Sequence, residues 1–215
     1  MSTAYGQYLL RTGAGILGKI ELLWGRYWYE TRFKGLAPVL DLAPGRCWFT
    51  IQNPVDIAGV DKARDIVEHY SRLGINIQVG DAYSIPHPDD SFCGVFSCWL
   101  FEHLQDPQAA LAEVHRVLKP DGYCCIIVPT PVDMWAFYDD YTHVRPFTPR
   151  SLGQLATAAG FSRRYVTSWP WDRGLHQIHK VFGAKAAWSY IKFSDKILRR
   201  LGIVNNRQLA LEAWK

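Results

Sequence analysis

Residues 39–61 read VLDLAPGRCWFTIQNPVDIAGVD, and this stretch decides the fold class. It begins with an apolar strand pattern that runs to Asp41, and a turn is expected at Pro44-Gly45. A second apolar segment follows and ends at Asp61. Apolar runs bounded by turn residues are typical of parallel strands covered on both faces. A glycine turn lets backbone N–H groups approach a ligand, and a carboxylate at the next strand end can accept hydrogen bonds from a ribose diol. The stretch therefore predicts a βαβ unit suited to a nucleotide.

The alternation of apolar strands and amphipathic helices continues along the chain. Further strands are predicted at Asp56–Val60, Ile75–Val79, Cys93–Leu100, Tyr123–Val128 and Arg164–Ser168, and helices at Lys62–Leu73, from the Asp106 cap through Leu118, and at Pro149–Ala159. This spacing predicts an α/β fold with a doubly wound, mostly parallel, Rossmann-like sheet. Such sheets bind ligands beyond the carboxyl ends of their strands. Because Asp41, Asp61, Asp81, and Ser97 or Cys98 all fall at those ends, one cleft is expected to collect them.

Three regions are expected along the chain. Residues 1–36 form a helical cap rich in aromatic residues, residues 37–170 form the sheet domain, and residues 171–215 form a basic and aromatic helical extension. The cap either packs on the domain edge or acts as a lid or an interfacial helix. The tail either packs on the sheet or a partner subunit, or binds anionic lipid peripherally, since basic residues alternate with aromatic ones there.

Composition narrows the class of protein. A net charge of +4 does not predict a nucleic-acid partner, because such proteins concentrate basic residues on one face. No apolar run reaches the roughly 18 to 20 residues of a spanning helix, and no signal-peptide pattern is present. The five cysteines form no CxxC pair, which indicates a reduced, cytoplasmic protein with optional membrane contact through the tail.

Five segments between residues 39 and 131 carry a family resemblance when they are taken in order. VLDLAPG, GVD, QVGDA, SCWLFEHLQDP and RVLKPDGYCCIIVPTP resemble the motifs of class I S-adenosylmethionine-dependent methyltransferases, of the small single-domain, type 11-like kind. The later DDYTHVRPFTPRSLGQLATAAGF is similar to a segment of members associated with sugar, lipid or cell-surface glycan modification. The resemblance covers about residues 37 to 161. It implies methyl transfer from S-adenosylmethionine to a small, sugar-like or lipid-linked glycan acceptor, at oxygen.

The resemblance also implies which residues hold the cofactor. Asp41 would orient its methionine end, and Asp61 would hold the ribose hydroxyls. The other implied contacts are Ala43 and Gly45 beside the methionine end, Lys62, Asp81 and Ala82 along the adenine, and Ser97 and Cys98 on the cleft floor near the sulfonium. Carboxylates suit these places because they accept from amino and hydroxyl groups.

The loop after the first strand departs from the family pattern D-x-G-x-G-x-G, since Ala43, Gly45 and Cys47 stand at the glycine positions. A Cβ restricts the backbone and crowds a close ligand. The connector to Asp61 is also short, and Pro54 limits its helix. A second hypothesis is therefore a non-catalytic relative that binds a nucleoside or a partner protein. A nicotinamide-dependent oxidoreductase is disfavoured because the first turn lacks G-x-G-x-x-G.

Residues 138–145, YDDYTHVR, are expected to lie over the acceptor side of the cleft. His143 is the predicted general base, since an imidazole accepts protons near neutral pH. Asp140 would orient His143 or bind substrate, and Tyr141, Arg145 and His103 would line the acceptor pocket. The alternative for His143 is a structural histidine that ties the loop to the sheet.

No metal site is predicted from the sequence. His176 and His179 have a spacing that suits one helical face, but no third ligand stands nearby. The Glu102-His103 pair is interpreted as mainly structural, because it stands at the entry to the next helix.

Overall fold

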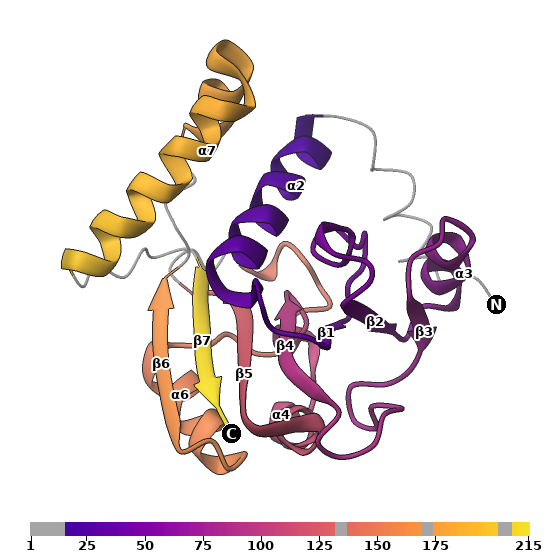
Figure 1. The fold of residues 1–215 in the computed structure, drawn as a ribbon. Helices are drawn as coiled ribbons and strands as arrows, with labels where there is room; N and C mark the ends of the chain where they lie inside the picture. Colours follow the sequence, from indigo (N-terminus) through magenta and orange to yellow (C-terminus); the bar gives the residue numbers. More distant parts are fainter. Residues whose placement is uncertain (1–15, 132–136, 169–173, 202–207) are drawn as a thin grey trace.

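The computed structural model describes residues 16–131, 137–168, 174–201 and 208–215. Its centre is a seven-stranded sheet in the order β3-β2-β1-β4-β5-β7-β6 (Figure 1). The strands are β1 (Val39–Leu42), β2 (Ile57–Asp61), β3 (Ile77–Val79), β4 (Phe92–Cys98), β5 (Leu118–Pro129), β6 (Arg163–Ser168) and β7 (Gln208–Trp214). The first five run parallel, whereas β7 pairs antiparallel with both β5 and β6. The predicted α/β fold with a mostly parallel sheet is confirmed.

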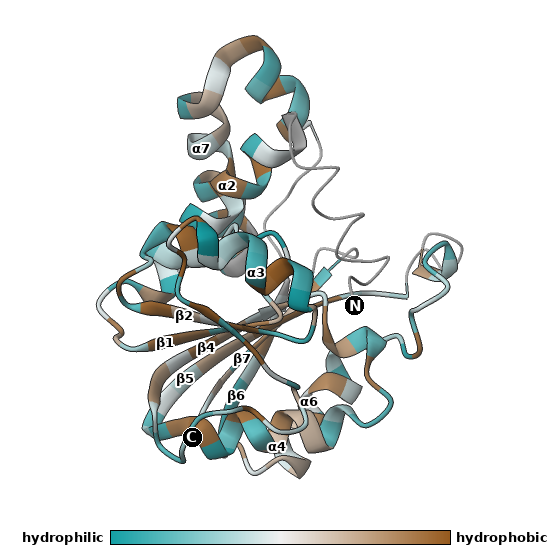
Figure 2. Ribbon diagram, turned by 90° about the vertical axis from the view of Figure 1, so that its right-hand side faces the viewer, coloured by the Kyte–Doolittle hydropathy of each residue, from teal (hydrophilic) through white to brown (hydrophobic). Residues whose placement is uncertain are grey.

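Helices cover both faces of the sheet (Figure 2). They are α2 (Ile16–Trp28), α3 (Arg64–Arg72), α4 (Pro107–Val117), α6 (Pro149–Ala158) and α7 (Leu175–Leu201), with short turns η1 (Tyr29–Phe33), η2 (Thr50–Gln52) and η3 (Phe101–His103). One apolar cluster joins α4 and α6 to the sheet, and a second joins α2 and α7 to the opposite face. Neighbouring residues of β5 therefore alternate between two covered faces, which explains its unbroken apolar run.

Local signals in the sequence set the helix boundaries. The Asp106 carboxylate accepts from the Ala109 N–H at 3.0 Å and begins α4, as predicted. Thr148 begins α6 in a capping box with Ser151, and Gly160 follows its end with φ 98°.

The connector between β1 and β2 contains the single turn η2 and no α-helix, in line with the short segment limited by Pro54. The sheet face above it is instead covered by α2 and α7. Trp28 of α2 and Phe49 of the connector are fully buried against Phe96 of β4, and the Phe49 and Phe96 rings stack at 4.1 Å. The N-terminal helix thus packs as a cap on the sheet, although residues 1–15 of the expected cap lie outside the described residues.

The C-terminal segment corrects one expectation. The tail was predicted to be mostly helical, with no strand singled out in it, but residues 208–214 form β7 between β5 and β6. The sheet is therefore completed by residues beyond 170. Lys215 fixes the end of this strand, because its ammonium donates to Asp90 and to the carbonyl of Leu118, both at 2.7 Å. The segment QLALEAW is rich in Leu, Ala and Glu, which favour helices, so its sequence did not indicate a strand.

Helix α7 is long and kinked at Gly183, where φ is 78°. Ala187 and Ile191 are buried toward α2, and Arg26 of α2 lies over the Trp188 ring at 4.8 Å. Among the described residues, no helix combines the length and the apolar character needed to cross a membrane.

Candidate active site

The turn after β1 keeps a backbone shape that three glycines would adopt easily. The angle φ is 58° at Ala43, 52° at Gly45 and 54° at Cys47. A non-glycine residue in this left-handed region costs about 1–2 kcal/mol, so two of the three positions are strained. The Cys47 side chain is fully buried and packs with Ile66 of α3 and Ile77 of β3. The thiol also lies 3.9 Å from the Gly45 carbonyl oxygen, so this buried side chain packs against the turn itself.

Asp61 ties this turn to the end of β2. One carboxylate oxygen accepts from the Gly45 N–H at 3.2 Å, and the other accepts from the Ala63 N–H at 2.8 Å. Burial raises the pKa of Asp61, and the two backbone donors oppose that rise. Each carboxylate oxygen has a second lone pair, so Asp61 keeps the capacity to accept from a ribose hydroxyl.

Asp41 is buried at the centre of the sheet, with 2% of its surface exposed. Its carboxylate accepts from the Thr50 hydroxyl at 2.7 Å. Burial raises the pKa of Asp41 to about 7, against the lowering effect of the Thr50 hydrogen bonds. The carboxyl group is thus poised to gain from a nearby cation, because a positive charge favours its ionised form.

The residues predicted to border the adenine are exposed or half-buried. Lys62 is exposed and forms an ion pair with Asp81 at 3.0 Å. The Asp81 carboxylate also accepts from the Tyr83 N–H at 3.1 Å, which is the main reason that its pKa is lowered. Ala82 is half-buried and packs against the core cluster below α4.

The end of β4 is more enclosed than the sequence suggested. Ser97 is fully buried, and its hydroxyl donates to the Leu42 carbonyl at 3.0 Å. That hydroxyl is therefore used within the sheet. Cys98 is half-buried, and burial raises the pKa of its thiol well above the usual value.

The loop of residues 137–147 is held on η3, directly beyond β4. The N–H groups of Val144 and Arg145 both donate to the Glu102 carbonyl, at 2.8 and 3.2 Å. This docking brings His143 beside His103, with ring centroids 4.7 Å apart. Two segments about forty residues apart in the sequence are thereby joined at one place.

The two imidazoles are each anchored through one nitrogen. His143 Nδ1 lies 2.6 Å from the Phe137 carbonyl oxygen. His103 Nδ1 lies 2.9 Å from the Thr142 hydroxyl and 3.3 Å from its carbonyl oxygen. A carbonyl oxygen can only accept, so both Nδ1 atoms carry the proton, and each Nε2 keeps a lone pair that has no hydrogen-bond donor within the described residues.

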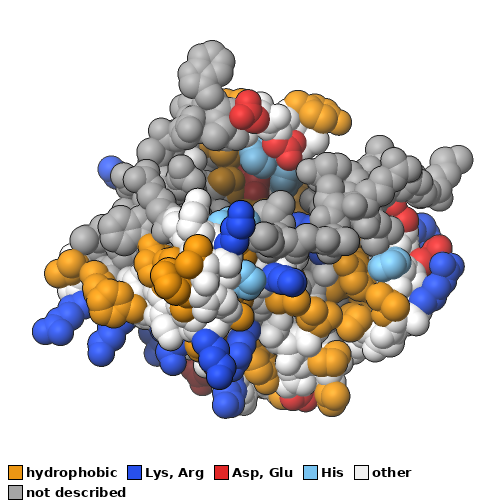
Figure 3. Space-filling view, turned by 90° about the horizontal axis from the view of Figure 1, so that it is seen from above, with side chains coloured by type: hydrophobic (Ala, Val, Ile, Leu, Met, Phe, Trp, Pro, Cys, Tyr) orange, Lys and Arg blue, Asp and Glu red, His pale blue; other side chains and the backbone are white. Residues whose placement is uncertain are grey.

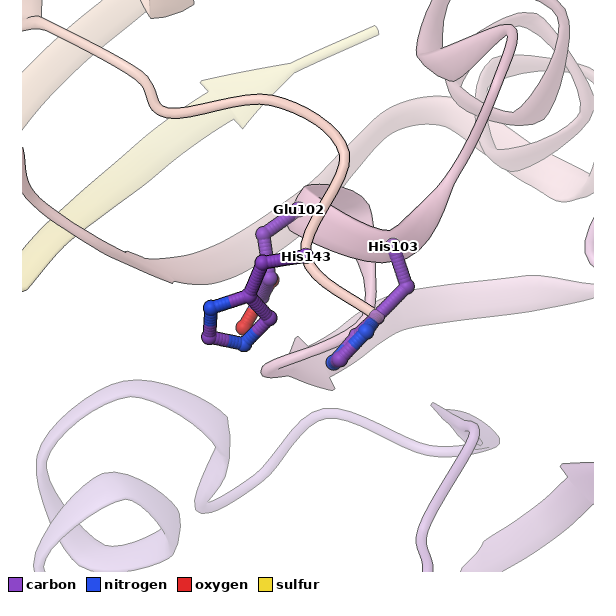
Figure 4. Close-up of side chains that lie close together, drawn as sticks. All are labelled: Glu102, His103 and His143. Carbon is purple, nitrogen blue, oxygen red and sulfur yellow. The ribbon is translucent and has the colours of Figure 1, made fainter. Parts of the chain in front are cut away.

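Glu102 completes this group. It is 1% exposed, and neither carboxylate oxygen has a hydrogen-bond partner within the described part of the chain. Burial raises the pKa of Glu102 to about 8. Figure 4 shows its carboxylate beside the His143 ring, while His103 points to the same side from the neighbouring position. One ligand atom from each of the three residues lies within 4.8 Å of the other two.

The remaining loop residues differ in their surroundings. Asp140 accepts from the Thr142 hydroxyl at 2.6 Å, which lowers its pKa, and its second oxygen lies 4.0 Å from His143 Nε2. Tyr141 is 93% exposed and projects into solvent. Arg145 is exposed and lies 3.4 Å from the Gln105 carbonyl. Seen from above, histidine and acidic side chains lie together in a recess of the surface (Figure 3).

The comparisons with known proteins agree with this geometry. Residues 40–126 match the family model described as a methyltransferase domain. This segment of the chain is therefore similar to a methyltransferase domain. Among curated relatives, the ubiquinone/menaquinone C-methyltransferase of Desulfotalea psychrophila is 34% identical over 45% of this chain and 43% of that protein. A demethylmenaquinone methyltransferase of Symbiobacterium thermophilum is 27% identical over 56% of this chain and 54% of that protein.

A solved structure extends the likeness of this methyltransferase domain to nearly the whole fold. A methyltransferase of Archaeoglobus fulgidus superposes with a TM-score of 0.67 at 23% identity, covering 91% of this chain and 94% of that one. The two curated relatives are longer, and the chain spans about half of their length.

The residues of the methyltransferase domain fit S-adenosylmethionine, the methyl donor of its class. The left-handed turn at residues 43–47 brings backbone, without a bulky side chain at Gly45, to the carboxyl end of β1. Asp61 can accept hydrogen bonds from a ribose diol. The ammonium group of the methionine end would favour the ionised form of the buried Asp41 carboxyl group. Because β1, β2 and β3 run parallel, Asp41, Asp61 and Asp81 lie toward the same end of these strands, whereas the Ser97 hydroxyl is already bonded to the Leu42 carbonyl.

Glu102 and Thr142 are the residues whose importance the sequence did not reveal. Glu102 was interpreted as structural, and Thr142 was not singled out. The signal available in the sequence was the Glu102-His103 pair after β4 together with a second histidine, His143, in a later loop. Their convergence depends on the docking of that loop, which no local pattern specifies.

Proposed function

We propose that this chain transfers a methyl group from S-adenosylmethionine to a small acceptor that carries a hydroxyl group. The observation that carries the proposal is the position of two sites on one sheet edge. β1 lies between β2 and β4, so the Asp41 strand end is next to the β4 end and the Asp61 strand end is one strand further along the sheet. Glu102, His103 and His143 stand just beyond β4. A methyl donor on the first two strands would face an acceptor held at this cluster.

On the donor side, S-adenosylmethionine supplies an electrophilic methyl group on a sulfonium. Asp61 would accept from the ribose hydroxyls while the Gly45 and Ala63 N–H groups hold its carboxylate in place. Asp41 would bind the positively charged methionine end. Lys62, Asp81 and Ala82 would border the adenine.

On the acceptor side, His143 is the group that takes the proton of the hydroxyl. Its Nε2 is free, and the bond from Nδ1–H to the Phe137 carbonyl would stabilise the imidazolium that forms. Asp140, 4.0 Å from Nε2, adds a negative charge that favours the same product. Arg145 would attract an acidic group of the acceptor. Tyr141 projects into solvent, so it would contact only an acceptor long enough to reach beyond the cluster.

The chemistry of a buried acid-base cluster favours oxygen as the methylated atom, in a sugar-like or lipid-linked acceptor. A second candidate is a ring carbon of a hydroquinone, which the names of the quinone-modifying relatives support. Deprotonation of a ring hydroxyl makes the neighbouring carbon a nucleophile, so the same histidine would serve both reactions.

Helix α7 supports the proposal of an apolar or membrane-borne acceptor. Val181, Phe182 and Phe193 are each at least 64% exposed, and lysines 180, 185, 192 and 196 are exposed beside them. Exposed apolar side chains within a basic helix suit the surface of an anionic bilayer. We infer peripheral contact with lipid through this helix.

A transfer assay tests the proposal. Methyl-labelled S-adenosylmethionine is incubated with the full chain and, separately, with hydroxylated sugars, lipid-linked sugars and hydroquinones. Label on an oxygen supports the first candidate, and label on a ring carbon supports the second. Absence of both transfer and cofactor binding would instead favour the non-catalytic alternative, in which the fold binds a nucleoside or a partner protein.

A further inference from the structure

Two histidines and one glutamate present free ligand atoms to a common point. His103 and His143 each have Nδ1 engaged by the backbone or side chains of residues 137–142, and neither Nε2 has a hydrogen-bond partner among the described residues. Among the residues that the structure describes, an Asp140 oxygen lies 4.0 Å from His143 Nε2, beyond hydrogen-bond distance. The Glu102 carboxylate has no partner in the described part of the chain.

The surroundings of the two rings have the pattern that orients metal-bound histidines. Such a histidine usually donates its second N–H to a carbonyl or, directly or through another group, to a carboxylate. His143 does so to the Phe137 carbonyl. His103 does so through Thr142, whose hydroxyl in turn donates to Asp140 at 2.6 Å. Both rings are thus fixed in the tautomer that can bind a cation through Nε2.

Burial of Glu102 supplies an independent argument. A carboxylate that is 1% exposed and has no hydrogen-bond partner among the described residues loses its hydration without compensation from them. Of the groups that face it, the two histidines offer lone pairs and Asp140 offers a like charge. A bound cation would compensate Glu102 and satisfy both lone pairs together.

We propose that Glu102, His103 and His143 bind one divalent transition-metal ion. Two imidazoles and one carboxylate favour ions such as Zn²⁺, Fe²⁺ or Co²⁺ over Mg²⁺ and Ca²⁺, which prefer oxygen ligands. Ligands about 2.1 Å from zinc lie roughly 3.4 Å apart in a tetrahedron. The ligand atoms lie within 4.8 Å of one another, so small side-chain rotations close the site. This proposal departs from the sequence-based expectation of no metal.

Three protein ligands leave a coordination position open, and this gives the site a use that rests on the function proposed above. The open position would take the oxygen of the acceptor hydroxyl, and the hydroxyl proton would pass to water. Metal binding would then replace proton transfer to His143 as the means of activating the acceptor.

Metal titration of the full chain, stripped with chelator, tests the inference without any acceptor. We expect one Zn²⁺ per chain by calorimetry and a visible absorption band with Co²⁺ that reports nitrogen and oxygen ligands. Mg²⁺ should not compete. Glu102→Gln keeps the side-chain volume and should weaken Zn²⁺ at least 10-fold, whereas His176→Gln on α7 should leave the affinity unchanged.

A second variant separates the orienting network from the ligands. Thr142→Val removes the hydroxyl that holds His103, and loss of such a partner typically weakens metal affinity 10- to 100-fold. Equal Zn²⁺ affinity in wild type, Glu102→Gln and Thr142→Val would overturn the metal site and leave the metal-free acid-base cluster. Titration of S-adenosylmethionine into the same stripped protein tests the proposed function separately, because donor binding without metal binding rejects the inference alone.

Discussion

Asp41→Asn should make the free energy of unfolding less dependent on pH. The carboxyl group of Asp41 is 2% exposed, and burial raises its pKa from 3.8 to about 7. Because the folded-state pKa is the higher one, this group contributes stability that is complete below pH 4 and is lost as the pH rises through 7. Asparagine is uncharged at every pH and still offers an oxygen to the Thr50 hydroxyl.

The size of the effect follows from the shift. One pKa unit corresponds to about 1.4 kcal/mol. Between pH 5 and pH 7, the free energy of unfolding of the wild-type protein should therefore fall by about 2 to 3 kcal/mol relative to that of Asp41→Asn. Urea unfolding at half-unit pH steps measures both proteins. The exposed Asp139→Asn serves as the matched control, and its difference from wild type should stay constant. A constant difference for Asp41→Asn as well would refute the account of this buried carboxyl group.

Three further predictions concern the turn, the base and the tail helix. Ala43→Gly should leave the free energy of unfolding unchanged or raise it by up to about 1 kcal/mol, since φ is 58° there, while Ala109→Gly within α4 should lower it by about 1 kcal/mol in urea unfolding. His143→Ala should lower methyl transfer at least 100-fold, as expected on loss of a general base, with donor affinity in calorimetry changed less than about twofold; equal turnover would reject the base assignment. Phe182→Glu or Phe193→Glu should weaken flotation with anionic vesicles about tenfold each, and equal recovery with neutral and anionic vesicles would reject lipid contact.

The sequence predicted those parts of the fold that local patterns encode. Caps at Asp106 and Thr148, the apolar run of β5 and the acids at strand ends each depend on a few neighbouring residues, and all stand where expected. β7 was missed because its place between β5 and β6 depends on pairing with distant strands, which the helix-forming residues of QLALEAW do not announce.

The candidate site was predictable only in part for the same reason. Ala43 and Cys47 read as a damaged glycine turn, yet the backbone takes the left-handed shape because surrounding hydrogen bonds, such as that from Ala43 N–H to Val60 at 2.8 Å, impose it. The grouping of Glu102 with His143 depends on two N–H groups that bind the Glu102 carbonyl. Such long-range docking leaves no periodic signal in the sequence.

Calorimetric titration of the full chain with S-adenosylmethionine and S-adenosylhomocysteine tests the central claim most directly. We expect micromolar binding of both, one molecule per chain, and at least tenfold weaker binding to Asp61→Asn than to the matched surface variant Asp139→Asn. Absence of binding by both ligands, with a folded wild-type protein, would contradict the claim that the strand ends of β1 and β2 hold a methyl donor.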